Sequence, residues 1–309
     1  MPGAYAHITA VNIASETDRL QSAGISAEAA IALGRYKGFL ELGAVSPDYP
    51  YLDVAFGSSA KKWADKMHYT NTGFMVGHGI EHLSYVRQEA REKCIAWLLG
   101  YAAHLVADLT IHPIVELRVG PYHKNAADHR TCEMHQDAYI FNRMDVGEVG
   151  ASEHLDSGIS RCCGKDDSLL DEDIKALWLA MLSSNYPSDF TANEPDPDSW
   201  HSGFKTIVDT VEEGYKLFPI ARHVAADKGL TYPARENIDA SFIENLQTPS
   251  GTAHYDEIFD TAVSNIVQMW KQISDGLNQQ EPAILAQLGN WNLDTGRDEN
   301  DQLVYWGVA

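Results

Sequence analysis

The chain of 309 residues is short of basic side chains and of long apolar runs. Its 23 Lys and Arg against 44 Asp and Glu give a formal charge of −21 at pH 7, with no extended basic run. That charge opposes binding to bulk nucleic acid or to anionic membranes. No uninterrupted apolar run approaches the roughly 20 residues that span a bilayer. We therefore expect neither a nucleic-acid partner nor a stable membrane anchor.

Cysteines are also scarce, and none of the spacings is typical of a disulfide framework. The four are Cys94, Cys132, Cys162 and Cys163. The last two are adjacent, and neighbouring cysteines rarely pair because the bond would be strained. Residues 1–7 contain neither a basic leader nor an apolar segment, so no signal peptide is expected. These features predict reduced thiols and a cytoplasmic location.

Most of the chain has the 3.6-residue apolar period of helices. The expected helices cover residues 26–43 (begun by Ser26 and closed by Gly43), 88–118, 128–144, 171–184, 197–218 and 255–277. Strand-like alternation is confined to 302–306, and residues 45–57 and 185–199 have the composition of loops. The sequence predicts an all-α fold: a single multi-helix bundle over residues 1–309, with an insertion at about 145–200.

The most informative segment lies within the strongest apolar run. His104, Asp108 and His112 recur every four residues and therefore share one face of a helix. If that face turns inward, the three polar groups need a cation or hydrogen-bond partners to offset their loss of hydration. A polar stripe facing solvent is the alternative.

A second ladder follows at His129 and Glu133, with Asp137 one turn later. Imidazole and carboxylate together form a donor set suited to Zn²⁺. Either ladder alone is a weak signal, but two neighbouring helices that each carry one could line a common cavity. Further candidates are Asp48 in a turn bracketed by prolines, and His68 and His7.

In this order, the residues resemble the zinc-dependent phospholipase C family, whose superfamily includes fungal single-strand nucleases. The resemblance rests on an early His, then Gly-x-x-x-Pro-Asp at 43–48, an aromatic-flanked His, Gly-Tyr-x-x-His-x-x-x-Asp at 100–108 and His-x-x-x-Glu at 129–133. It covers roughly the first 140 residues.

The resemblance implies a metal cleft with two to three zinc ions. His68, His104 and Asp108 would hold one ion, and Asp48 would touch it or act as the general base. The second ion would have a separate set of ligands: His112, His129 and Glu133. His7 and the bridging Asp108 would hold the third.

The chain departs from the secreted members of this family at two points. In those members an amino-terminal Trp also binds the third ion, whereas this chain begins with Met1 and Pro2. They also place the next His six residues after the bridging Asp, whereas His112 follows Asp108 by four. His123 therefore competes with His112 as the ligand.

The resemblance implies a zinc-dependent phosphoester hydrolase that acts on phospholipid headgroups or on small phosphoesters. The alternative is a zinc-binding helical protein with the same fold, used for non-phosphate chemistry or for ligand binding. A di-iron oxidase fits less well, because that class needs Glu-x-x-His pairs and the chain has none. The oligomeric state stays open.

Overall fold

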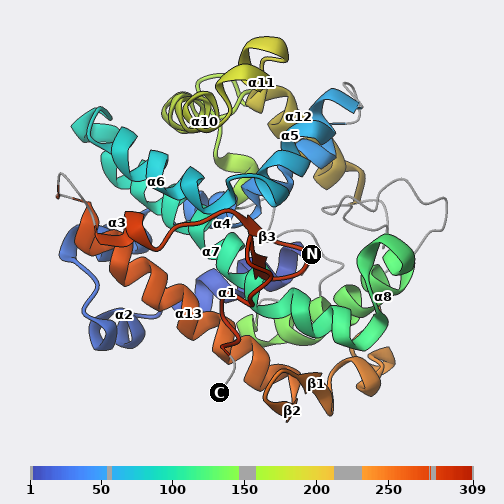
Figure 1. The fold of residues 1–309 in the computed structure, drawn as a ribbon. Helices are drawn as coiled ribbons and strands as arrows, with labels where there is room; N and C mark the ends of the chain where they lie inside the picture. Colours follow the sequence, from blue (N-terminus) through green and yellow to red (C-terminus); the bar gives the residue numbers. More distant parts are fainter. Residues whose placement is uncertain are drawn as a thin grey trace.

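The computed structural model describes residues 3–53, 58–145, 158–211, 232–277, 279 and 283–307. Helices dominate, and the all-α class is confirmed (Figure 1). The α-helices are α1 (Ala4–Ala14), α2 (Thr17–Ala23), α3 (Ala27–Arg35), α4 (Lys37–Val45), α5 (Ser58–Tyr69), α6 (Thr72–Leu83), α7 (Gln88–Val119), α8 (Tyr122–Phe141), α10 (Glu172–Asn185), α11 (Pro187–Ala192), α12 (Pro197–Val211) and α13 (Tyr255–Gly276).

Short 3₁₀ helices and two small hairpins complete the described architecture. The 3₁₀ helices are η1 (Ser46–Leu52), η2 (Asn142–Met144), η4 (Ile159–Arg161), η5 (Arg235–Asn237), η6 (Ala240–Phe242) and η7 (Ala283–Ala286). Antiparallel pairs are formed by β1 (Leu246–Thr248) with β2 (Gly251–Ala253), and by β3 (Trp291–Asn292) with β4 (Arg297–Asp298).

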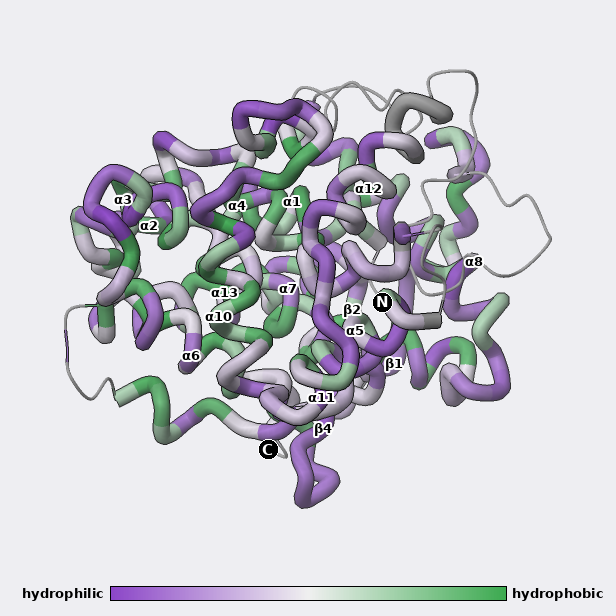
Figure 2. Tube along the Cα trace, turned by 90° about the horizontal axis from the view of Figure 1, so that it is seen from above, coloured by the Kyte–Doolittle hydropathy of each residue, from purple (hydrophilic) through white to green (hydrophobic). Residues whose placement is uncertain are grey.

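Helix α7 is the centre of the molecule, with α4, α13, α3, α6 and α8 packed around it. Within the described residues it alone is long and apolar enough to cross a membrane, which the search for uninterrupted apolar runs did not predict. His104, Asp108 and His112 break the strict run, yet the mean hydropathy of its best window is still 1.6. All of that window is buried inside the molecule, as in the core helix of a bundle. Figure 2 shows hydrophobic chain around α7 in the interior, whereas the chain that protrudes at the edge beside β4 is hydrophilic.

Helix α4 crosses α7 at close range, and the crossing depends on two glycines. A Cβ on Gly43 would lie 2.1 Å from the carbonyl oxygen of Trp97, and a Cβ on Gly100 would lie 2.1 Å from that of Leu40. The prediction that Gly43 ends a helix was therefore wrong: the chain breaks at Tyr36 instead, and Gly43 lies inside α4. Ser26 does cap α3, since its side chain accepts from the Ala29 N–H.

Besides the break at Tyr36 and the helices α1, α2, α5 and α6, which were not among the expected ones, three segments differ from the sequence prediction. Residues 46–52 form η1, and residues 187–192 form α11, where loops were expected. In both cases a proline at the first turn presets a helical φ, which composition alone hides. The strand expected at 302–306 is reduced to an isolated bridge between Leu303 and Arg297.

The expected insertion contains α10, which packs against α6 and α7 and buries Trp178 and Met181. Residues 146–157 of that insertion, and residues 212–218 of the helix expected from 197, lie outside the described residues. All four cysteines are free, in agreement with the sequence prediction.

Candidate metal centre

The ladder on α7 faces inward. His104 and Asp108 are 0% exposed and His112 is 1% exposed, although ordinary solvated polar side chains would project to the surface. Nε2 of His104 lies 3.4 Å from Oδ2 of Asp108, one turn along the helix. The interpretation of this ladder as a solvent-facing stripe is therefore wrong.

Backbone carbonyls orient three of the histidines. Nδ1 of His104 bonds the Ala44 carbonyl at 2.9 Å, that of His68 bonds Ala64 at 2.7 Å, and that of His112 bonds Leu293 at 2.5 Å. Because a carbonyl only accepts, each Nδ1 carries the proton and each Nε2 keeps its lone pair. This is the usual preparation of a metal-binding histidine.

The carboxylate of Asp108 joins two histidines from different helices. Its Oδ1 lies 3.3 Å from Nε2 of His7 on α1, while its Oδ2 faces His104. The rings of His7 and His104 stack with centroids 4.1 Å apart. Burial alone would raise the pKa of Asp108, but the neighbouring His104 and His112 hold it well below its usual value. Asp108 is thus an anion that bridges two imidazoles.

Asp48 and His68 complete the same buried group from η1 and α5. Oδ1 of Asp48 lies 3.2 Å from Nε2 of His68, and both side chains are 0% exposed. The rings of His68 and His104 are 5.6 Å apart. The structure brings together two sets of candidate ligand atoms, each within 4.8 Å: His7, His104 and Asp108; and Asp48, His68 and His104.

The donor atoms that face this space are buried without hydrogen-bond partners within the described structure. They are Nε2 of His7, His68, His104 and His112, and both carboxylate oxygens of Asp48 and Asp108. Each buried polar atom without a hydrogen bond lowers the stability of the fold by about 1–3 kcal/mol, and a charged group by more. A divalent cation would satisfy several at once. These nitrogen and oxygen donors are of the kind that zinc prefers, so the residues fit the metal.

His112, His129 and Glu133 form a looser neighbouring set. Nε2 of His112 and Nδ1 of His129 each lie 3.9 Å from Oε1 of Glu133. The Gly120 carbonyl accepts from Nε2 of His129 at 2.6 Å, which turns Nδ1 toward Glu133. His123, the competitor of His112, is exposed near the start of α8. Of the two, only His112 lies against Glu133.

Comparison with known proteins identifies the family of the chain. The sequence model of the zinc-dependent phospholipase C family matches residues 6–187, which is more than half of the chain and a range that contains all eight candidate ligands. The chain belongs to the zinc-dependent phospholipase C family. The family is all-α and consists of phospholipase C hydrolases that act on phosphoester bonds. No curated protein and no solved structure matches the chain.

Two residues that support this candidate metal centre were missed by sequence reasoning. The Leu293 carbonyl comes from the turn after β3, far beyond the family match, and nothing local marks it as a partner of His112. Asp137 was visible as the end of the second ladder but received no role. Its Oδ1 accepts from the Ala6 N–H at 2.9 Å, and its Oδ2 accepts from the Tyr232 hydroxyl at 3.1 Å.

Asp137 serves as the N-terminal cap of α1, which carries His7. The local cap position is Gly3, which has no side chain to form a cap, and a Cβ there would lie 1.8 Å from Oδ2 of Asp137. Helices need acceptors for their first N–H groups, and a carboxylate also suits the positive end of the dipole. Burial raises the pKa of Asp137 to about 7.

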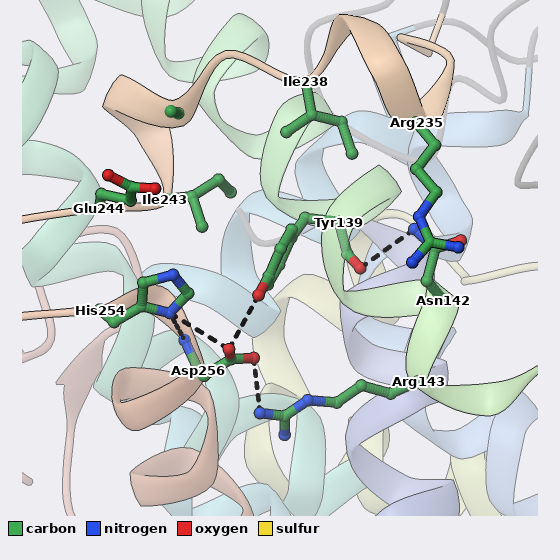
Figure 3. Close-up of a pocket in the computed structure, with 10 residues that line it drawn as sticks. Tyr139, Asn142, Arg143, Arg235, Ile238, Ile243, Glu244, His254 and Asp256 are labelled. Atoms are coloured by element: carbon green, nitrogen blue, oxygen red, sulfur yellow. Dashed lines mark hydrogen bonds and ion pairs between the residues drawn. The ribbon is translucent and has the colours of Figure 1, made fainter.

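A separate cavity of about 550 Å³ lies between α8, residues 235–244 and the start of α13 (Figure 3). Its lining includes Arg143 and Arg235 but none of the candidate metal ligands. Asp256 takes a hydrogen bond from Tyr139 at 2.8 Å and pairs with Arg143 at 2.6 Å. The charge of Arg143 is thereby offset within the cavity, whose lining also contains Arg235 and Glu244.

Proposed function

We propose that the protein is a zinc-dependent phosphoester hydrolase of the phospholipase C type that holds two to three zinc ions. The observation that carries the proposal is the group of buried donor atoms without partners around Asp108. Asp48, His68, His104 and Asp108 would hold one ion. A second would have its own ligands: His112, His129 and Glu133. His7 and Asp108 would share in a third, since the two oxygens of Asp108 face different histidines.

Zinc ions bound there would lower the pKa of water to about 7 and withdraw charge from a phosphoryl group. The chain itself would supply the base. Asp48 has one oxygen beside His68, and the other is free to accept the proton of the attacking water. General-base assistance of this kind contributes about 10²–10⁴-fold. The backbone bonds to Nδ1 of His68 and His104 would keep both rings in place during the reaction.

The substrate class follows from charge and family. A chain of net charge −21 would repel a polymeric polyanion, so we infer a phospholipid headgroup or a small phosphoester rather than nucleic acid. The reduced cysteines are compatible with the cytoplasmic location inferred for this chain.

Elemental analysis and a hydrolysis assay test the proposal together. Protein purified without added metal should contain two to three zinc per chain. It should release phosphocholine from phosphatidylcholine vesicles, or nitrophenol from bis(p-nitrophenyl) phosphate, and EDTA should abolish that activity.

His104→Ala should lose both zinc and activity, because His104 belongs to both ligand groups. His82→Ala is the matched control: His82 is half-buried on α6, away from the candidate ligands, and its Nε2 lies 2.9 Å from the Ser184 hydroxyl, so zinc and rate should be kept. Bound zinc with no turnover of either substrate would instead support a zinc-binding helical protein with another role.

A further inference from the structure

We propose that His201, on α12, is a positioning residue for Asp48, and that it acts through a buried hydrogen bond to the Tyr49 hydroxyl. The proposal rests on the proposed role of Asp48. His201 lies beyond residues 6–187, so the family match does not include it. No ligand ladder marks it in the sequence.

His201 contacts Tyr49, which is the residue next to Asp48. The Tyr49 hydroxyl lies 3.2 Å from Nδ1 of His201, and both side chains are 0% exposed. Tyr49 follows Asp48 in η1, so a displacement of the tyrosine ring moves the backbone that carries the carboxylate. A hydrogen bond without competing water fixes such a position more tightly than apolar contact, because it has a preferred distance and direction.

Aromatic packing restricts the pair further. The Tyr49 ring stacks on Phe204 with centroids 5.1 Å apart and on His201 at 6.0 Å. Phe204 lies one turn after His201 on α12. Burial lowers the pKa of His201 to about 4, so the imidazole is neutral at pH 7 and can form an uncharged hydrogen bond there.

Hydrogen bonds also fix the chain at the start of η1 and just after its end. On one side of Asp48, the Trp97 indole N–H on α7 donates to the Ser46 hydroxyl at 2.9 Å. On the other side, the Ser199 hydroxyl on α12 donates to Asp53 at 2.8 Å. Thus α7 holds the turn at its start, and α12 holds it at Tyr49 and Asp53. Apolar core packing alone does not require these three hydrogen bonds on the turn that carries the candidate base.

Substitutions that remove only this hydrogen bond test the proposal. Tyr49→Phe deletes one oxygen, and His201→Phe keeps a ring of similar size. Each should lower kcat between about 10- and 100-fold with little change in KM, the cost expected for a slightly misplaced group. The double variant should be no worse than either single variant, because both remove the same bond.

The conservative variant and a control separate positioning from general loss of stability. His201→Asn places an amide near the position of Nδ1 and should restore most of the rate. Tyr139→Phe removes the hydrogen bond that the Tyr139 hydroxyl donates to Asp256. This bond lies far from η1, so the variant should keep the wild-type kcat. If His201→Phe does not fold, Tyr49→Phe carries the test.

A spectroscopic measurement keeps this inference apart from the proposed hydrolase activity. In Co²⁺-substituted protein, Tyr49→Phe and His201→Phe should change the visible d–d bands and weaken Co²⁺ affinity, whereas His201→Asn and Tyr139→Phe should not. If the wild type hydrolyses no phosphoester, the proposed function fails, and the cobalt spectra alone decide the positioning role. Wild-type kcat and unchanged spectra in both Phe variants would overturn it.

Discussion

Several side chains of the candidate site could be predicted from the sequence, because the helical repeat relates residues only a few positions apart. His104, Asp108 and His112 must share a face once α7 forms, whatever surrounds it. What the spacing does not reveal is which atoms meet. That Oδ1 of Asp108 meets His7, more than 100 residues earlier, depends on how α1 docks against α7.

Asp48→Asn should separate metal binding from turnover. The amide keeps one oxygen donor but cannot take up the proton, so most zinc should remain while kcat falls by about 10²–10⁴-fold. Elemental analysis and steady-state kinetics measure the two effects. Asp18→Asn, at an exposed carboxylate of α2, should change neither. Undiminished turnover in Asp48→Asn would remove Asp48 from the mechanism.

Asp137 should make stability depend on pH. Burial raises its pKa from 3.8 to about 7, so between these values the folded state holds a proton that the unfolded chain releases. The stabilisation from this group is therefore complete below about pH 4 and is lost as the pH rises through 7.

Urea unfolding of the metal-free protein can measure this effect against Asp137→Asn, which cannot titrate. The unfolding free energy of the wild type relative to the variant should fall by roughly 1 kcal/mol per pH unit between pH 5 and 7. Parallel curves for the two proteins would show that Asp137 does not titrate in this range.

At the scale of elements, the longer helices were predictable, whereas α1, α2, α5, α6 and most helix ends were not. The apolar pattern identified α7, α8, α10, α12 and α13, although the apolar part of α7 is buried on nearly all sides and not along one face alone. The break at Tyr36 and the 3₁₀ geometry of η1 have no such repeat. Glycine often ends helices, which predicts a helix end at Gly43, whereas here its missing side chain lets α4 approach α7.

Gly43→Ala should damage both packing and the site. The added Cβ would overlap the Trp97 carbonyl, so α4 must move away from α7 and carry the Ala44 acceptor away from His104. We expect a loss of about 1–3 kcal/mol in the free energy of unfolding, together with weaker zinc binding. Urea unfolding and zinc titration measure the two.

Gly34→Ala is the matched control for Gly43→Ala. It is an exposed position of α3 with nothing within 4 Å of the added Cβ. Since alanine favours a helix over glycine, this variant should be as stable as the wild type or more so by up to about 1 kcal/mol. If Gly43→Ala behaves in the same way, the close approach of α4 to α7 is not required.

At the scale of the whole molecule, the metal centre joins segments from most of the described helical core. Its candidate ligands come from α1, η1, α5, α7 and α8, and a C-terminal turn orients one of them. Binding energy at such a site is also folding energy, because the unfolded chain does not preserve the ligand geometry.

Removal of zinc should therefore destabilise the entire fold. With zinc at about 1,000 times its dissociation constant, bound metal contributes about 4 kcal/mol. EDTA should lower Tm by on the order of 10 °C in a chain of this length. Added Zn²⁺ should restore Tm, whereas Mg²⁺ should not, because it prefers oxygen ligands. Calorimetry that finds the same Tm with and without EDTA would contradict a structural contribution from the metal.

The amino-acid sequence alone determined the helical class and the two ladders of ligands, because both arise from contacts within a few residues. Only the tertiary structure decided that Asp108 meets His7, that His112 and not His123 lies near Glu133, and that Tyr49 is bonded to His201. Each of these pairs joins segments separated along the chain. Their meeting depends on how glycine-lined helices pack and on where buried polar groups find partners, and no local repeat encodes either.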